Sequence, residues 1–113
     1  MKVFVYFNLH RKLWSVKAME GPKKGLVIKH ANDIKLVDCK FKVSEAGRQR
    51  VIREQRKNVH AGVVGTMVEH EIPCSLPISY NPYRFAHFFN KNTLDPVLSS
   101  PAVTMSGRQV FCQ

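Results

Sequence analysis

The segment Ile34-Lys-Leu-Val-Asp-Cys-Lys-Phe-Lys-Val43 has the alternation of a long strand. Its apolar residues start on one parity, at Ile34 and Leu36, and continue on the other parity, at Val37, Cys39, Phe41 and Val43. Alternation with a period of two is typical of a strand with one buried face, and a change of parity requires an extra residue. The segment therefore predicts a strand with a bulge near Leu36–Val37 and with its lysines, Lys40 and Lys42, facing solvent.

The residues that follow, from Ser44 to Lys57, predict the principal helix of the chain. Ser44 is a favourable N-cap, and Glu45 suits the positive end of the helix dipole in the first turn. At 100° per residue the apolar side is narrow, and the opposite side carries four cations: Arg50, Arg53 and Lys57, with Arg56 at the edge. We expect Asn58 to end this helix.

The rest of the chain predicts mainly strands. Lys2–Asn8, Leu13–Met19 and Leu26–Ala31 precede the quoted segment, and the stretch from Val59 to Ile72 returns after the helix. Helical turns are expected over Arg84–Asn90, and a terminal hairpin is expected over residues 102–112. We predict an α+β fold, in which a mostly antiparallel sheet has the amphipathic basic helix, about 44–57, packed on it. Residues 1–113 are expected to form a single domain.

The charge of the chain predicts a negatively charged partner. The formal net charge is +10 over 113 residues, with eighteen Lys and Arg against eight Asp and Glu. Residues 1–60 hold fifteen cations against five acids, whereas residues 61–113 hold three of each. An excess confined to half of the chain favours one basic face and a more neutral back.

Several classes of protein are not supported. The N-terminus lacks the apolar core and cleavage site of a signal peptide, and no stretch approaches the roughly 20 apolar residues of a membrane helix. The three cysteines are far apart, which disfavours both a disulfide framework and a zinc site. We therefore expect a cytoplasmic protein that binds no metal, no cofactor and no membrane.

The cations of the predicted helix are the first candidate site. Arg50, Arg53, Arg56 and Lys57 form a ridge that suits phosphate groups, because arginine offers a bidentate donor fork and lysine a mobile point charge. Binding of this kind releases counterions and so depends strongly on salt. The competing interpretation is an ordinary solvated helix face.

Two histidines form a second candidate site. His60 follows the helix, and His10 lies beside Arg11 and Lys12 in the first connector. A pair of histidines with nearby cations suits phosphodiester cleavage without a metal, in which one imidazole removes a proton and the other protonates the leaving oxygen. The sequence does not show whether these histidines meet, and a structural role for each is the alternative.

The aromatic segment from Ser79 to Phe89 is the third candidate site. Tyr80, Tyr83 and Arg84 surround a rigid Asn81-Pro82 turn and suit the stacking of bases. The phenylalanines of the segment are better interpreted as anchors to the core.

These same residues resemble a group of short proteins encoded by tailed bacteriophages and prophages. The resemblance lies in Phe7-Asn-Leu-His-Arg-Lys12 with Ser15-Val16, in Gly47-Arg-Gln-Arg-Val-Ile-Arg-Glu-Gln-Arg-Lys-Asn-Val-His-Ala61, and in Tyr80-Asn-Pro-Tyr83. It implies a phage origin and a place in the cytoplasm of the infected bacterium, and it implies no particular activity. It also ties the three candidate sites into one recurring pattern, which favours a shared ligand site.

Three hypotheses follow. The first is a small phage accessory protein that binds RNA or DNA, with Arg50, Arg53, Arg56, Lys57 and Arg84 at phosphates and bases, Tyr80 and Tyr83 stacking, and Asn58 orienting the loop of His60. The second is a metal-independent nuclease or nucleotide phosphodiesterase with His10 and His60 as catalytic residues. The third is an inhibitor whose basic face covers an acidic surface of a host enzyme or an anti-phage defence complex. The sequence leaves the oligomeric state open.

Overall fold

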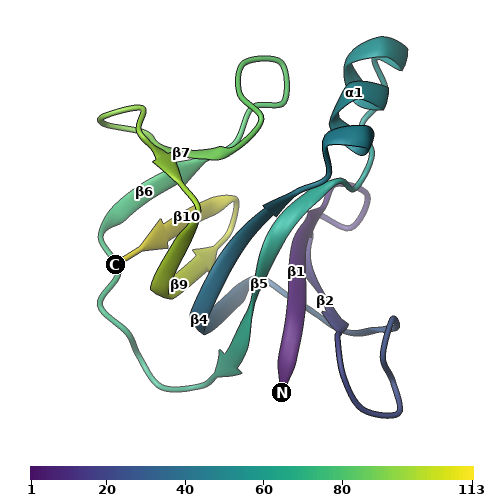
Figure 1. Ribbon diagram of the computed structural model, residues 1–113. Helices are drawn as coiled ribbons and strands as arrows, with labels where there is room; N and C mark the ends of the chain where they lie inside the picture. The colour runs from purple at the N-terminus through teal and green to yellow at the C-terminus, as the bar shows by residue number, and fades with distance from the viewer.

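The computed structural model describes residues 1–113, which form one ten-stranded sheet and a single helix (Figure 1). The elements are β1 (Lys2–Asn8), β2 (Leu13–Ala18), β3 (Val27–Ala31), β4 (Asp33–Val43), α1 (Glu45–Glu54), β5 (Ala61–Val68), β6 (Leu76–Ser79), β7 (Phe88–Asn90), β8 (Pro96–Val97), β9 (Ser99–Ser106) and β10 (Gln109–Cys112). The strand order is β3-β2-β1-β5-β4-β9-β10-β6-β7-β8, and every neighbouring pair is antiparallel.

The predicted α+β architecture, with a principal helix packed on the sheet, is wrong. Strands hold 51% of the residues and the helix only 9%, so the fold is dominated by its sheet. The helix α1 covers residues 45–54 rather than 44–57, because Gln55 turns into the left-handed region with φ 52°. Val51 is its only buried residue, which gives α1 too little apolar surface to cover a sheet. It stands instead at the end of the sheet, between β4 and β5 (Figure 1).

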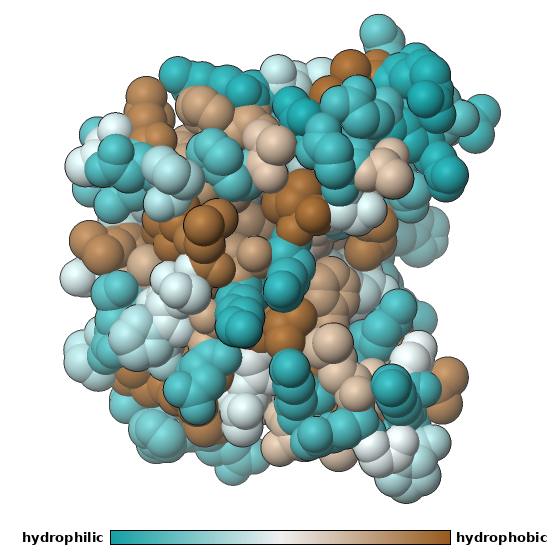
Figure 2. All heavy atoms as spheres, in the orientation of Figure 1, coloured by the Kyte–Doolittle hydropathy of each residue, from teal (hydrophilic) through white to brown (hydrophobic).

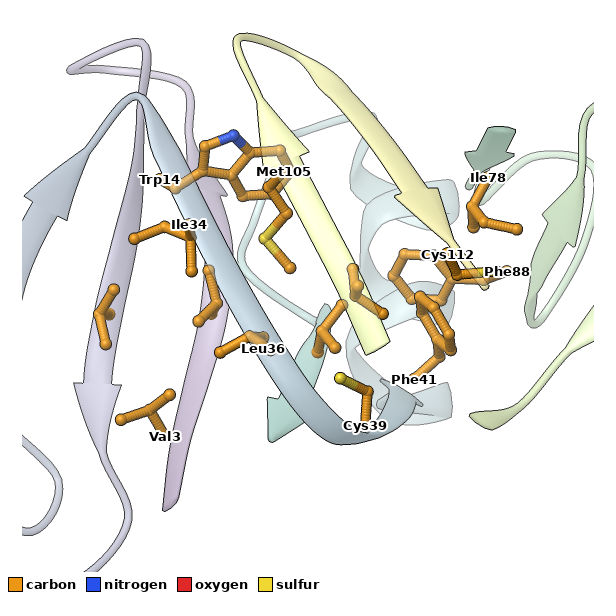
Figure 3. Close-up of a cluster of buried hydrophobic side chains, with 14 residues drawn as sticks. Val3, Trp14, Ile34, Leu36, Cys39, Phe41, Ile78, Phe88, Met105 and Cys112 are labelled. Carbon is orange, nitrogen blue, oxygen red and sulfur yellow. The ribbon is translucent and has the colours of Figure 1, made fainter. Parts of the chain in front are cut away.

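The sheet buries its apolar face by curling onto itself. Fourteen buried residues from eight strands form one cluster, which Figure 3 shows between opposing parts of the sheet. Phe41 of β4 and Phe88 of β7 belong to strands four places apart in the sheet, yet their ring centroids are 5.0 Å apart. The curl of the sheet therefore covers the apolar face that the predicted helix was expected to cover.

The expected bulge in β4 is confirmed, and it is centred slightly later than predicted. The pairing with β5 shifts between Val37 and Lys40, and Asp38 has φ 52°. This extra residue places Leu36 and Cys39 on the same buried face, with exposed fractions of 0% and 2%. Burial, reinforced by the charge of Asp38, raises the pKa of the Cys39 thiol to about 12. Burial also raises the pKa of Cys112, and all three cysteines are free.

Two further local predictions have different outcomes. The terminal hairpin is confirmed, since β9 and β10 pair around Gly107, which has φ 60°. The helical turns over Arg84–Asn90 are wrong, because a single hydrogen-bonded turn from Asn81 to Phe85 gives way to β7. The ring of Phe88 belongs to the core cluster, and the strand β7 places it there while Phe89 is buried on the opposite side of the strand.

Gly62 in β5 allows β1 to approach closely. A Cβ atom at this position would lie 2.5 Å from the carbonyl oxygen of Val5 and 2.6 Å from Cζ of Phe4. We expect Gly62→Ala to lower the free energy of unfolding by about 1–3 kcal/mol, because backbone atoms must shift to admit the methyl group. Urea denaturation measures this loss. Ser99→Ala, at an exposed strand position, is the matched control and should change stability by less than about 0.5 kcal/mol. Equal stability of the two variants would contradict this packing.

Candidate functional site

A cleft of about 1080 Å³ opens at the end of the sheet where α1 stands. Its floor is the open end of the core and includes Val5, Val63 and Ile78. The last residues of β1, the connector from α1 to β5, the loop after β6 and the turn before β10 form its walls. In Figure 1, α1 and the β6–β7 loop rise at this same end of the sheet.

The lining of the cleft contains no aspartate and no glutamate. Its cationic side chains come from three segments, as Lys57, Lys91 and Arg108. Two histidines and seven aromatic residues also line it: His10, His60, Tyr6, Phe7, Trp14, Tyr80, Tyr83, Phe88 and Phe89. A cleft with this composition suits a ligand that is both anionic and aromatic.

His60 and Tyr80 form the central polar contact of the cleft. The hydroxyl of Tyr80 lies 2.7 Å from Nε2 of His60, and Nδ1 of His60 lies 2.8 Å from the carbonyl oxygen of Asn58. A carbonyl oxygen only accepts, so Nδ1 carries the hydrogen that it donates to Asn58. In the neutral imidazole Nε2 then has a free lone pair and accepts the hydroxyl hydrogen of Tyr80.

The helix and the following strand hold His60 in this position. The backbone amide of Ser44 donates to the carbonyl oxygen of His60 over 2.7 Å. Gly47 lies against the histidine so closely that a Cβ at this position would be 2.5 Å from Cβ of His60. The side chain of Ser44 also accepts from the amide of Gly47, which confirms Ser44 as the N-cap of α1. Gly47 therefore leaves the space against α1 that His60 occupies.

The surroundings of Tyr80 keep its hydroxyl protonated. Burial raises the pKa of Tyr80 to about 12, although the nearby charge of Arg48 acts in the opposite direction. Its ring stacks on Phe88 with centroids 5.1 Å apart, and so connects the site to the core. A neutral phenol at this position donates a hydrogen bond to His60 and does not act as an anionic nucleophile.

Arg48 ties α1 to the loop that carries the tyrosines. Its Nε donates to the carbonyl oxygen of Pro82 over 2.8 Å, and its Nη1 lies 2.9 Å from Oε1 of Glu45. The side chain of Arg48 is only 15% exposed. Hydrogen bonds from Gln49 and from Arg48 lower the pKa of Glu45, which keeps the arginine paired. This arrangement fixes one wall of the cleft while leaving Tyr83 61% exposed.

The opposite wall is built around Arg108. Its guanidinium carbon lies 5.3 Å from the ring centroid of Phe7, and the Phe7 ring meets Trp14 edge-on with centroids 5.1 Å apart. The indole Nε1 of Trp14 donates to the carbonyl oxygen of Gly107 over 2.7 Å. These contacts hold the β9–β10 turn against β1 and β2, and this position brings Arg108 to the cleft.

The structure brings together six of the ten residues predicted for the candidate sites. His10, Lys57, Asn58, His60, Tyr80 and Tyr83 line the cleft, whereas Arg50, Arg53, Arg56 and Arg84 do not. Because α1 ends at Glu54, Lys57 lies on the connector and leaves the predicted ridge of cations. Figure 2 shows hydrophilic residues gathered over the α1 end of the molecule. The guanidinium of Arg84 lies over the ring of Phe85, at 5.1 Å.

Sequence reasoning missed Arg48, Lys91 and Arg108. Arg48 precedes the exposed ridge in the sequence, and nothing in the local pattern indicates that its side chain is half-buried. Lys91 and Arg108 belong to the half of the chain with no net charge, for which the charge distribution predicts a neutral back. The position of Arg108 beside Gly107 in a predicted hairpin turn was the one available signal.

Other kinds of site are not indicated. No group of three or more His, Cys, Asp or Glu side chains is arranged to hold a metal ion. The single helix is neither long enough nor apolar enough to cross a membrane.

Comparison with known proteins identifies relatives along nearly the whole chain. The family model described as the Mycobacterium phage L5 gene 82 protein matches residues 1–113. The gene 82 protein of Mycobacterium phage L5 is 43% identical over 115 residues, which cover 94% of this chain and 90% of that protein. No solved structure matches the chain.

The contact between Arg48 and Pro82 predicts unequal effects for two arginines of α1. Arg48→Ala removes a largely buried, charge-assisted hydrogen bond, so we expect the free energy of unfolding to fall by about 1.5–3 kcal/mol. Arg50→Ala, at an exposed position on the same helix, should change it by less than about 0.5 kcal/mol. Urea denaturation of both variants tests this difference. Equal losses would show that Arg48 does not hold the loop.

Proposed function

This chain belongs to the family of the Mycobacterium phage L5 gene 82 protein, and we propose that it binds RNA or DNA through the cleft. One observation supports this proposal above the others: the lining combines three cations and seven aromatic residues without a single acid. Phosphate groups would be held by Lys57, Lys91 and Arg108. Bases would stack on the exposed ring of Tyr83, next to the fixed pair of His60 and Tyr80.

The physical chemistry of the cleft favours an unpaired strand over a duplex. Bases of a single strand are free to stack on aromatic rings, which contributes about 1–3 kcal/mol for each base. The faces of paired bases are already stacked on their neighbours within a duplex, so they are not available for such stacking. The backbone amide of Tyr83 donates a hydrogen bond to Oδ1 of Asn81 over 3.0 Å, which fixes the loop backbone that carries this ring.

The exposed cations beside the cleft would extend the path of the phosphates. Arg50, Arg53 and Arg56 form no ion pair, because the two ion pairs of the protein join Lys35 to Glu71 and Arg48 to Glu45. Unpaired cations retain their full capacity to displace counterions from a nucleic acid. The ridge is shorter than the sequence indicated, and it leads toward the connector that carries Lys57.

Binding to labelled oligonucleotides tests this function. We expect anisotropy to show binding of single-stranded RNA or DNA that weakens steeply with salt, with duplex DNA bound less tightly. Lys57→Gln with Lys91→Gln removes two cleft cations, so binding should weaken by about tenfold, and the slope of log affinity against log salt should fall by about 1.4.

The double variant Lys23→Gln with Lys24→Gln is the matched control. It removes the same charge from the exposed turn between β2 and β3, outside the cleft, and should change the affinity by no more than about twofold. Absence of binding at low salt contradicts the proposed function. Equal losses in the two double variants would assign binding to overall charge rather than to the cleft.

Phosphodiester cleavage is the second candidate function, because His10 and His60 line the same cleft as Lys57. The free lone pair of His60 Nε2 is the basic atom that such a reaction needs, once a substrate hydroxyl replaces that of Tyr80. We expect cleavage of single-stranded RNA that persists in EDTA and falls by at least about 100-fold in both His10→Ala and His60→Ala. His87→Ala is the control. Cleavage by either cleft variant at the parental rate would exclude this mechanism.

A further inference from the structure

The face of the sheet opposite the core carries a second group of aromatic and cationic side chains. Val3 and Val5 point into the core, so Phe4 and Tyr6 lie on the other face of β1, with ring centroids 5.9 Å apart. The strand register places Phe4 between Lys17 of β2 and Val64 of β5, and Val64 is paired in turn with Lys40 of β4. One row across four strands thus has an aromatic ring between two lysines.

The next row carries one aromatic ring, Tyr6, and one lysine, Lys42. Tyr6 is paired with Ser15, and Ser15 with His30 at the edge of the sheet. On the other side of β1, Lys42 is paired with Gly62, against which the ring of Phe4 lies. The missing side chain at Gly62 lets this ring rest on the backbone.

The cations of this face are free to bind anions. Lys17, Lys40 and Lys42 form no ion pair, and neither of the two rows contains an acid. Two nearby acids have other partners, since Glu20 accepts from the amide of Lys2 and Glu71 pairs with Lys35, whereas Asp38, in the bulge of β4, is exposed and forms no ion pair. The charge complements a phosphate backbone, and the half-buried rings complement bases.

This face is continuous with the cleft. Tyr6 and Gly62 belong to its two rows and also line the cleft, at the place where β1 and β5 separate beyond the Val5–Val63 pair. A strand that leaves the cleft would reach Phe4 without crossing an acidic surface.

We infer that the outer face of β2, β1, β5 and β4 is a second, contiguous binding surface for a single-stranded nucleic acid. Phe4 and Tyr6 stack bases there, and Lys17, Lys40 and Lys42 hold phosphates. This inference rests on the proposed function, and it implies that the protein covers a longer strand than the cleft alone accommodates.

Oligonucleotides of two lengths test the inference. We expect the triple variant Lys17→Gln, Lys40→Gln and Lys42→Gln to bind an oligonucleotide of about 12 nucleotides at least about tenfold more weakly, and one of about 4 nucleotides as tightly as the parent. Lys23→Gln with Lys24→Gln and an added Lys29→Gln controls for the same loss of charge outside both surfaces. The lysines of the triple variant lie on the sheet surface, and a circular dichroism melt establishes that each variant is folded.

Each outcome supports or overturns the inference. Equal weakening for both lengths, or equal weakening in the charge control, overturns it in favour of a general electrostatic effect. No weakening for either length overturns it while leaving the cleft as the binding site. No binding of any oligonucleotide by the parent overturns the proposed function itself. As a second readout, photo-cross-linking of the longer oligonucleotide should label Phe4, which does not line the cleft, in addition to residues of the cleft, and labelling confined to the cleft overturns the inference.

Discussion

No helical layer covers the apolar face of this sheet, so the sheet must bury that face against another part of itself. The rest of the structure depends on this constraint. The bulge at Asp38 is essential to this burial, because it keeps Leu36 and Cys39 on the same side of β4. Gly65 accommodates the bulge, since a Cβ there would lie 3.0 Å from the carbonyl oxygen of Val37. With the face uninterrupted, the curl brings Phe41 against Phe88.

The cleft is a consequence of how the curl ends. The opposing parts of the sheet separate beyond the core, and polar contacts help to hold them there: His60 with Tyr80, Arg48 with Pro82, and Trp14 with Gly107. Each of these contacts joins segments that are far apart in the chain. These contacts fix the walls of the cleft and leave its interior open. The lining contains no aspartate or glutamate, and no group of side chains is arranged to hold a metal ion. Such a lining complements a ligand that is both anionic and aromatic.

The distribution of charge along the chain does not map onto the distribution of charge in space. The excess of cations lies before Ala61, yet Lys91 and Arg108 supply two of the three cations of the cleft. A segment with equal numbers of cations and acids still contributes a positive surface when the fold directs only its cations to one place. Arg48 shows the converse, because a cation from a basic segment is half-buried, pairs with Glu45 and donates to the carbonyl oxygen of Pro82, and so holds the loop.

The sequence by itself determined the local structure and half of the site. Alternation predicted the long strands and the bulge, and Ser44 predicted the start of α1. The resemblance to phage proteins, rather than the residue types, implied that His10, His60, Tyr80 and Tyr83 belong to one site, and all four line the cleft. The tertiary structure decided where the helix ends and what covers the sheet, because a single buried residue on α1 leaves that task to the sheet's own curvature. It also decided which cations reach the cleft, since Lys91 and Arg108 are brought there by contacts between segments that are distant in the chain, and local sequence patterns do not report such contacts.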